Sequence, residues 1–144
     1  MNAFRMIRLG AIGLALVSRL VCAHELDASL DCHSGPHEFI AQFVAAKEIG
    51  SKPAEVSESS VNVYRPQSKR DLTALGFGVQ GVFGFSPNDN MFTQKGRGEA
   101  PQPVYGVVVM AWQDAVNERI REMGSPATVK EVIPMVMTAV VCQQ

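Results

Sequence analysis

The chain has 144 residues with 13 basic and 14 acidic side chains, and this balance excludes the basic surface that nucleic-acid binding requires. Hydrophobic residues make up 47% of the sequence, which is enough to form the core of one domain near the commonest domain size. We therefore expect a single small domain without a nucleic-acid partner.

Residues 1–23 have the pattern of a secretory signal peptide. A start with two arginines precedes an apolar stretch at residues 9–17, and residues 21–23 have side chains suited to a cleavage site. The apolar stretch is shorter than the roughly 20 residues that span a membrane, so we expect removal and no later membrane contact. The exported domain, residues 24–144, then begins at His24 and is periplasmic or secreted.

Alternating apolar and polar residues at 26–32 predict a strand whose buried face carries Cys32. Gly35 and Pro36 predict the start of an amphipathic helix that continues to Gly50. Residues 51–60 have the polar composition of a loop.

We expect a short strand at residues 61–64 and a longer one at 75–85. In the longer strand, apolar side chains occupy odd positions and glycines occupy several even positions. One face is then nearly bare, which suits a bent sheet or the close approach of another backbone. Residues 86–90 have the composition of a turn, and residues 91–93 are expected to begin a returning strand.

Two apolar runs in the second half of the chain predict central strands, at residues 104–111 and 135–142. Between them, residues 112–123 have the apolar stripe of an amphipathic helix, which Gly124 ends. The predicted fold class is therefore α+β, with two amphipathic helices against a mostly antiparallel sheet of about five to six strands.

Two cysteines remain after cleavage, Cys32 near the start of the domain and Cys142 near its end. In an oxidising compartment such a pair usually joins, so we expect one disulfide between them. The chain-entropy treatment gives such a long loop a stabilisation of roughly 4 to 5 kcal/mol as an upper figure.

Two patterns suggest enzymatic or nucleotide chemistry. The glycines of residues 76–81 match G-x-G-x-x-G, but phosphate binding needs a helix after the glycines, and here a strand continues. The run from Asp31 to Gly35 resembles the Asp-Cys-Ser-Gly start of the nucleophile helix in bacterial cell-wall cysteine peptidases. That family places its general-base histidine after the cysteine, whereas this chain has no histidine after His37. We therefore expect neither nucleotide binding nor enzymatic activity, and no catalytic residue.

The three histidines of the mature chain leave metal binding as an alternative. An N-terminal His24 offers an imidazole and an α-amine to one copper ion, the arrangement seen in histidine-brace proteins. The further imidazole that a brace needs could come only from His33 or His37. Apart from this alternative we expect no metal and no cofactor.

Residues 86–99 combine turn residues with hydrophobic and basic side chains of the kinds that are favoured in protein interfaces. Within this segment we predict a partner-binding element made of Asn88, Asp89, Asn90, Met91, Phe92, Lys95 and Arg97. The alternative is an ordinary loop in which Met91 and Phe92 turn inward.

The overall organisation combines a signal peptide, one cysteine pair and a small domain without a catalytic motif. In this it resembles the small periplasmic immunity proteins of type VI secretion systems. The resemblance implies a non-enzymatic inhibitor that occludes the active site of a toxic cell-wall-degrading effector. The alternatives are a structural or envelope-assembly binding module and a copper-binding protein, and a homodimer is compatible with each.

Overall fold

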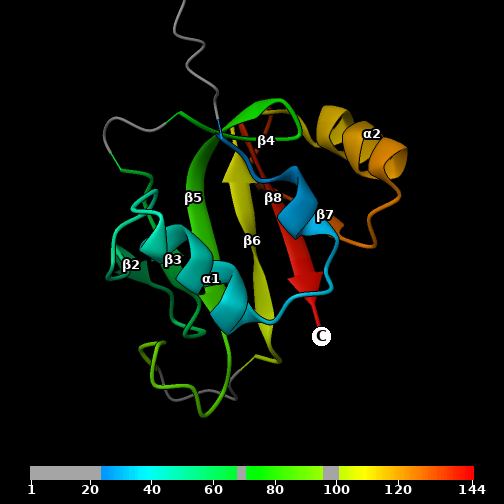
Figure 1. Cartoon of the computed structure of the whole chain (residues 1–144). Helices are drawn as coiled ribbons and strands as arrows, with labels where there is room; N and C mark the ends of the chain where they lie inside the picture. The colour runs from blue at the N-terminus through cyan, green and yellow to red at the C-terminus, as the bar shows by residue number, and fades with distance from the viewer. Residues whose placement is uncertain (1–23, 68–70, 96–100) are drawn as a thin grey trace, which may run out of the picture.

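The structure, a computed structural model, describes residues 24–67, 71–95 and 101–144 (Figure 1). The predicted signal peptide and Arg97 lie outside the described residues. Within the described ranges, no helix is long and apolar enough to cross a membrane.

Two α-helices, one short 3-10 helix and eight strands make up the described part of the chain, which confirms the α+β class. In chain order they are β1 (His24–Glu25), η1 (Asp27–Leu30), α1 (Pro36–Ala45), β2 (Glu55–Val56), β3 (Asn62–Tyr64), β4 (Leu72–Ala74), β5 (Phe77–Phe85), β6 (Val104–Val109), α2 (Gln113–Met123), β7 (Thr128–Ile133) and β8 (Met137–Gln143). The structure thus has more strands than the five to six predicted, because the two-residue strands β1 and β2 add to the edges of the sheet.

The sheet is antiparallel except for the pairing of β1 with β4. Its strand order is β1-β4-β5-β6-β8-β7, and β3 pairs with the second half of β5 and carries β2. The long strands β5, β6 and β8 form the centre, and each of them runs between the two ends of the sheet that are upper and lower in Figure 1.

The helix α1 packs against one face of this sheet. The ring of Phe39 in α1 lies 4.5 Å from the ring of Tyr105 in β6. Tyr105 is level with Cys142 in β8, so both side chains project from the helix-bearing face. A side chain at Gly84 would collide with Ile40 of α1, since an added Cβ would lie 3.0 Å from its Cγ1. The expected close approach to the glycine face is therefore made by a helix.

The predicted strand at residues 26–32 is wrong, because this segment forms the 3-10 helix η1. Leu26 and Leu30 are both buried, whereas Ala28 is exposed, as one helical turn requires and alternation does not. The side chain of Asp27 accepts a hydrogen bond from the backbone N–H of Leu75 at 2.6 Å. This bond holds the turn against the connection between β4 and β5.

The predicted single apolar face of residues 75–85 is also wrong. A β-bulge lies between Val79 and Gly81, so that Val79 and Val82 share the helix-bearing face while Phe83 lies on the opposite one. The sequence alternation could not show this change, because a bulge adds one residue and inverts every later side chain.

Three boundaries differ from the predictions. Helix α1 ends at Ala45 rather than near Gly50, and Lys47 adopts a positive φ of 56° just beyond it. Residues 91–93 form a turn and a bend instead of a returning strand. Strand β7 was not predicted, because its residues are almost all exposed and show no apolar alternation.

Candidate functional site

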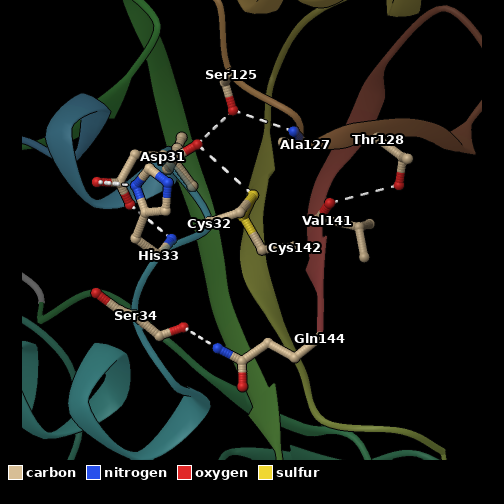
Figure 2. The surroundings of a disulfide bond; sticks show 11 residues. Asp31, Cys32, His33, Ser34, Ser125, Ala127, Thr128, Val141, Cys142 and Gln144 are labelled. Carbon is tan, nitrogen blue, oxygen red and sulfur yellow. Dashed lines mark hydrogen bonds and ion pairs between the residues drawn. A yellow bond between two sulfur atoms is a disulfide. The ribbon is translucent and has the colours of Figure 1, made fainter.

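The disulfide between Cys32 and Cys142 forms as predicted and ties the first residues of the domain to the last strand (Figure 2). On one side of it, the hydroxyl of Ser125 donates a hydrogen bond to the carbonyl of Leu30. On the other side, the side-chain amide of Gln144 donates to the carbonyl of Ser34 at 2.6 Å. The segment before α1 is thereby fixed to both β8 and the end of α2.

The run that resembles a peptidase nucleophile contains no free thiol here. Cys32 is bonded to Cys142 and precedes the first residue of α1, Pro36, by four positions. The carboxylate of Asp31 accepts the backbone N–H of His33 and lies 3.2 Å from its imidazole, and these contacts lower the pKa of Asp31. Both side chains are exposed, so the pair is a surface contact.

The two described histidine side chains face different partners. His33 is 83% exposed beside Asp31, whereas Nδ1 of His37 lies 2.8 Å from Oδ2 of Asp89. The side chain of His24 lies outside what the structure describes. Among the described residues, no three histidine, cysteine or acidic side chains are grouped so that they could hold a metal ion.

The glycine-rich run at residues 76–81 forms the turn between β4 and β5 and the start of β5. Leu75 and Gly76 make a two-residue turn, with φ angles of 57° and 81°, between the paired residues Ala74 and Phe77. The run continues as a strand without a helix, so its backbone does not offer the N–H groups that hold phosphate.

The predicted partner-binding segment forms a loop at the lower end of the sheet, and its described part is fastened at several points. Asn62 in β3 accepts a hydrogen bond from the N–H of Thr93 and donates one to its carbonyl, both at 2.9 Å. The hydroxyl of Ser60 accepts the N–H of Lys95 at 2.9 Å, and Nζ of Lys95 lies 3.2 Å from the carboxylate of Glu58.

Within this loop the hydrophobic side chains turn inward. Phe92 is buried and lies 6.2 Å from Phe85 by ring centroids, and Met91 packs against the core. The prediction that Phe92 contacts a partner is therefore corrected, because its ring belongs to the core. Asp89 is mostly buried. The pKa of Tyr64 is raised, first by the burial of its own hydroxyl and second by the negative charge of Asp89. Apart from Pro87, the residues that the described loop exposes are polar: Asn88, Asn90, Thr93, Gln94 and Lys95.

The large hydrophobic side chains that the described chain exposes gather at the opposite end of the sheet. We call this set the apical patch; it consists of Met110, Trp112, Val132, Ile133, Met135 and Val136, which are 44% to 68% exposed. Among the described residues, the one further exposed side chain of this kind is Met123, near the end of α2. Such a concentration marks an interaction surface, whereas scattered exposed hydrophobics need no explanation.

Two chain connections build the apical patch, and both lie where β6 ends and β8 begins, at the upper end in Figure 1. One is the junction from β6 to α2, and the other is the turn between β7 and β8; the last two residues of β7, Val132 and Ile133, complete the patch beside this turn. Val109 is paired with Thr138 and Ile133 with Met137, so the two connections are neighbours across the sheet.

Hydrogen bonds hold these connections in place. The hydroxyl of Thr138, itself buried, donates to the carbonyl of Ala111 at 2.7 Å. The N–H of Met110 donates to the carbonyl of Gly78 at 3.0 Å, which fastens the junction to β5. The turn is closed by a bond from the N–H of Val136 to the carbonyl of Ile133 at 3.0 Å. The apolar side chains therefore project from a preformed backbone.

The apolar pattern at these residues predicts burial, whereas the structure exposes them. Met110 belongs to an apolar run that predicts a buried strand, and Met135 and Val136 belong to another. The structure ends β6 at Val109 and begins β8 at Met137, so the outer members of both runs fall in connections. Pro134, which directly precedes the second run, is the signal that could have marked a turn there.

Comparison with known proteins adds no relative: no family model, curated protein or solved structure matches this chain.

Proposed function

We propose that this chain is an exported, non-enzymatic binding domain that docks onto a protein partner through its apical patch. The observation that carries the proposal is the gathering of six large exposed hydrophobic side chains at one end of the sheet, four on two adjoining, hydrogen-bonded connections and two at the end of β7. Aromatic and methionine side chains are enriched at the centres of protein interfaces, and a tryptophan is the commonest energetic hot spot.

A fixed backbone favours this role. Association loses conformational entropy wherever loops must become ordered, and a surface that is already ordered loses less. The bonds from Thr138 and Met110 fix the patch before any partner arrives. The Cys32–Cys142 disulfide supports an oxidising compartment as the place of action, because such bonds persist outside the cytoplasm.

The specific role that we propose is that of an immunity protein, which inserts the apical patch into the active-site cleft of a toxic cell-wall-degrading effector. An inhibitor that blocks an active site needs a rigid protruding surface, and it needs no catalytic residues. The overall organisation of the sequence supports this choice, and the apical patch replaces the loop at residues 88–97 as the proposed occluding element.

The test is capture of partners by the disulfide-bonded protein from envelope and secreted fractions of the source cell, followed by a binding measurement with the purified partner. Trp112→Ala and Met135→Ala should each weaken binding, with the tryptophan change costing on the order of 2 kcal/mol or about thirtyfold in affinity. A partner that is a cell-wall hydrolase should lose activity when the wild-type protein binds.

The matched control changes exposed side chains of the opposite loop, Asn88→Ala and Asn90→Ala, which should leave the affinity unchanged. If the loop variants abolish binding while Trp112→Ala and Met135→Ala retain it, the apical patch is not the docking surface. If the captured partner is an envelope assembly protein without hydrolase activity, the result supports the docking surface and contradicts the immunity role.

A further inference from the structure

A hollow beside the apical patch contains both apolar and acidic groups. It lies between the start of α2 and the end of β7 and is lined by Trp112, Gln113, Asp114, Glu131 and Met135. Trp112 and Met135 are 63% and 68% exposed, the two highest values among the large hydrophobic side chains that the structure describes. The indole ring and the thioether therefore form accessible walls with two carboxylates between them.

No cationic side chain of the described residues pairs with the carboxylates of this hollow, although Asp114 lies in the first turn of α2, where the helix dipole favours a negative charge. Neither Asp114 nor Glu131 forms an ion pair or side-chain hydrogen bond with another described residue. Lys130 is adjacent to Glu131, but successive side chains of a strand project to opposite faces. Arg119 on α2 pairs with Glu122 at 3.4 Å and lines a different hollow.

We propose that this hollow receives an arginine or lysine side chain of the protein partner. The inference rests on the proposed function, since it takes the apical patch as the docking surface. A cation over the face of Trp112 is attracted by the ring, and the carboxylates of Asp114 and Glu131 supply charge complementarity. Apolar side chains beside the cation then contact Trp112 and Met135, which line the hollow and are exposed.

The same charges disfavour an anionic membrane as the occupant. A surface helix or loop that binds acidic lipids combines apolar side chains with lysine and arginine, whereas this hollow carries carboxylates. The carboxylates would be repelled by the lipid phosphates, so a protein segment with a positive charge is the better match.

Strand addition at the edge of the sheet is also disfavoured. In the described structure β7 pairs on one side only, with β8, and its other edge is exposed. A bulge between Glu131 and Ile133 distorts this edge, and Lys130 and Glu131 place charges along it. Bulges and charges are the features by which edge strands avoid pairing with other chains. Recognition by side chains in the hollow therefore fits this end of the molecule better.

The test uses the fluorescence of Trp112, which is the only tryptophan of the chain and so reports on this hollow alone. The disulfide-bonded protein is titrated with acetyl-Leu-Arg-Leu-amide and with the same peptide carrying citrulline, which has the shape of arginine without its charge. The arginine peptide should bind about five- to tenfold more tightly at low salt, and this preference should shrink at high salt.

Asp114→Asn combined with Glu131→Gln should abolish the preference for arginine over citrulline. The matched control is Glu38→Gln with Glu55→Gln, which removes one carboxylate from the first turn of the other helix and one from another strand. It changes the net charge equally and should keep the preference. Equal binding of the two peptides to the wild type, or a preference that survives Asp114→Asn with Glu131→Gln, overturns the proposal.

Partner binding separates this inference from the function on which it rests. If Trp112→Ala and Met135→Ala weaken partner binding while Asp114→Asn with Glu131→Gln leaves it unchanged, the docking surface stands and the cation-binding hollow is excluded. If Trp112→Ala and Met135→Ala bind the partner as the wild type does, the docking surface itself is excluded.

Discussion

The connections at the two ends of the sheet both contain methionine and aromatic side chains but place them in opposite ways (Figure 1). At the lower end, the loop after β5 buries Phe92 and exposes polar groups. At the upper end, the connections around α2 and β8 expose Trp112 and Met135. Turn composition thus indicates that a segment protrudes, but it does not tell which of its side chains face the solvent.

The difference follows from what lies beneath each connection. The lower loop can fold back toward α1, and there the ring of Phe92 comes close to Gly84, where a missing side chain leaves space. At the upper end, the junction from β6 to α2 buries the small side chain of Ala111, whereas the larger side chains of Met110 and Trp112 on either side of it stay exposed. The first arrangement serves stability, and the second leaves apolar surface available for binding.

The strongest test of this comparison sets Phe92→Ala against Trp112→Ala. Removing the buried ring should lower the free energy of unfolding by about 3 to 5 kcal/mol, as large-to-small core changes do. Removing the exposed indole should change it by less than about 0.5 kcal/mol. Urea denaturation followed by circular dichroism measures both. A destabilisation by Trp112→Ala as large as that by Phe92→Ala would show that the apical patch is part of the core.

Replacing both disulfide cysteines tests whether the stability of the whole domain can be lowered without changing the peptide affinity of the apical patch. Cys32→Ala with Cys142→Ala should lower the free energy of unfolding by about 2 to 5 kcal/mol, because the unfolded chain regains its freedom. Cys142 lies near the end of β8, whereas the apical patch lies where this strand begins, so the peptide affinity of the folded protein should not change. A loss of affinity in protein that remains folded would contradict the independence of the patch from the disulfide.

Asn62→Ala tests how the lower loop is fastened. Its side chain is buried and makes three hydrogen bonds, to Ser60 and Thr93, and the change leaves the N–H and C=O of Thr93 without these partners. We expect a loss of about 1 to 3 kcal/mol. Hydrogen exchange should accelerate at residues 92–95 more than at residues 109–112. Asn90→Ala, at an exposed position of the same loop, is the control and should have little effect; uniform acceleration along the chain would contradict local fastening.

The sequence predicted the features that single residues mark, namely helix ends and the disulfide, and the strands whose apolar residues form an unbroken run. Pro36 and Gly124 mark the start of α1 and the end of α2, and Cys32 and Cys142 form the expected pair. The bulge beside Gly81 was not predictable from alternation, because the extra residue depends on pairing with β6. Burial of Phe92 likewise depends on the space above Gly84, which exists only once α1 lies on the sheet.

For the candidate site, sequence reasoning selected interface residue types in a segment whose large hydrophobic side chains turn inward. Met91 and Phe92 are of the same types as Met135 and Trp112, so composition could not distinguish the two ends of the sheet. What distinguishes them is the end of β6 at Val109, one residue before the first exposed side chain of the patch. Strand ends depend on the pairing partner, β8, and are therefore set by the tertiary fold.

The smallest expected effect concerns the ion pair that links the lower loop to α1. Nδ1 of His37 lies 2.8 Å from Oδ2 of Asp89, and Oδ1 of Asp89 accepts the N–H of Met91. Asp89→Asn keeps an oxygen for Met91 and removes the charge, so it should resemble His37→Ala in its effect. Because His37 is half exposed, a double-mutant cycle should give a coupling of about 0.2 to 1 kcal/mol. A coupling well above this range would mean that the charge pair, rather than the burial of Phe92, holds the loop in place. The contrast between an inward-facing loop and an outward-facing patch would then depend on the contact between His37 and Asp89.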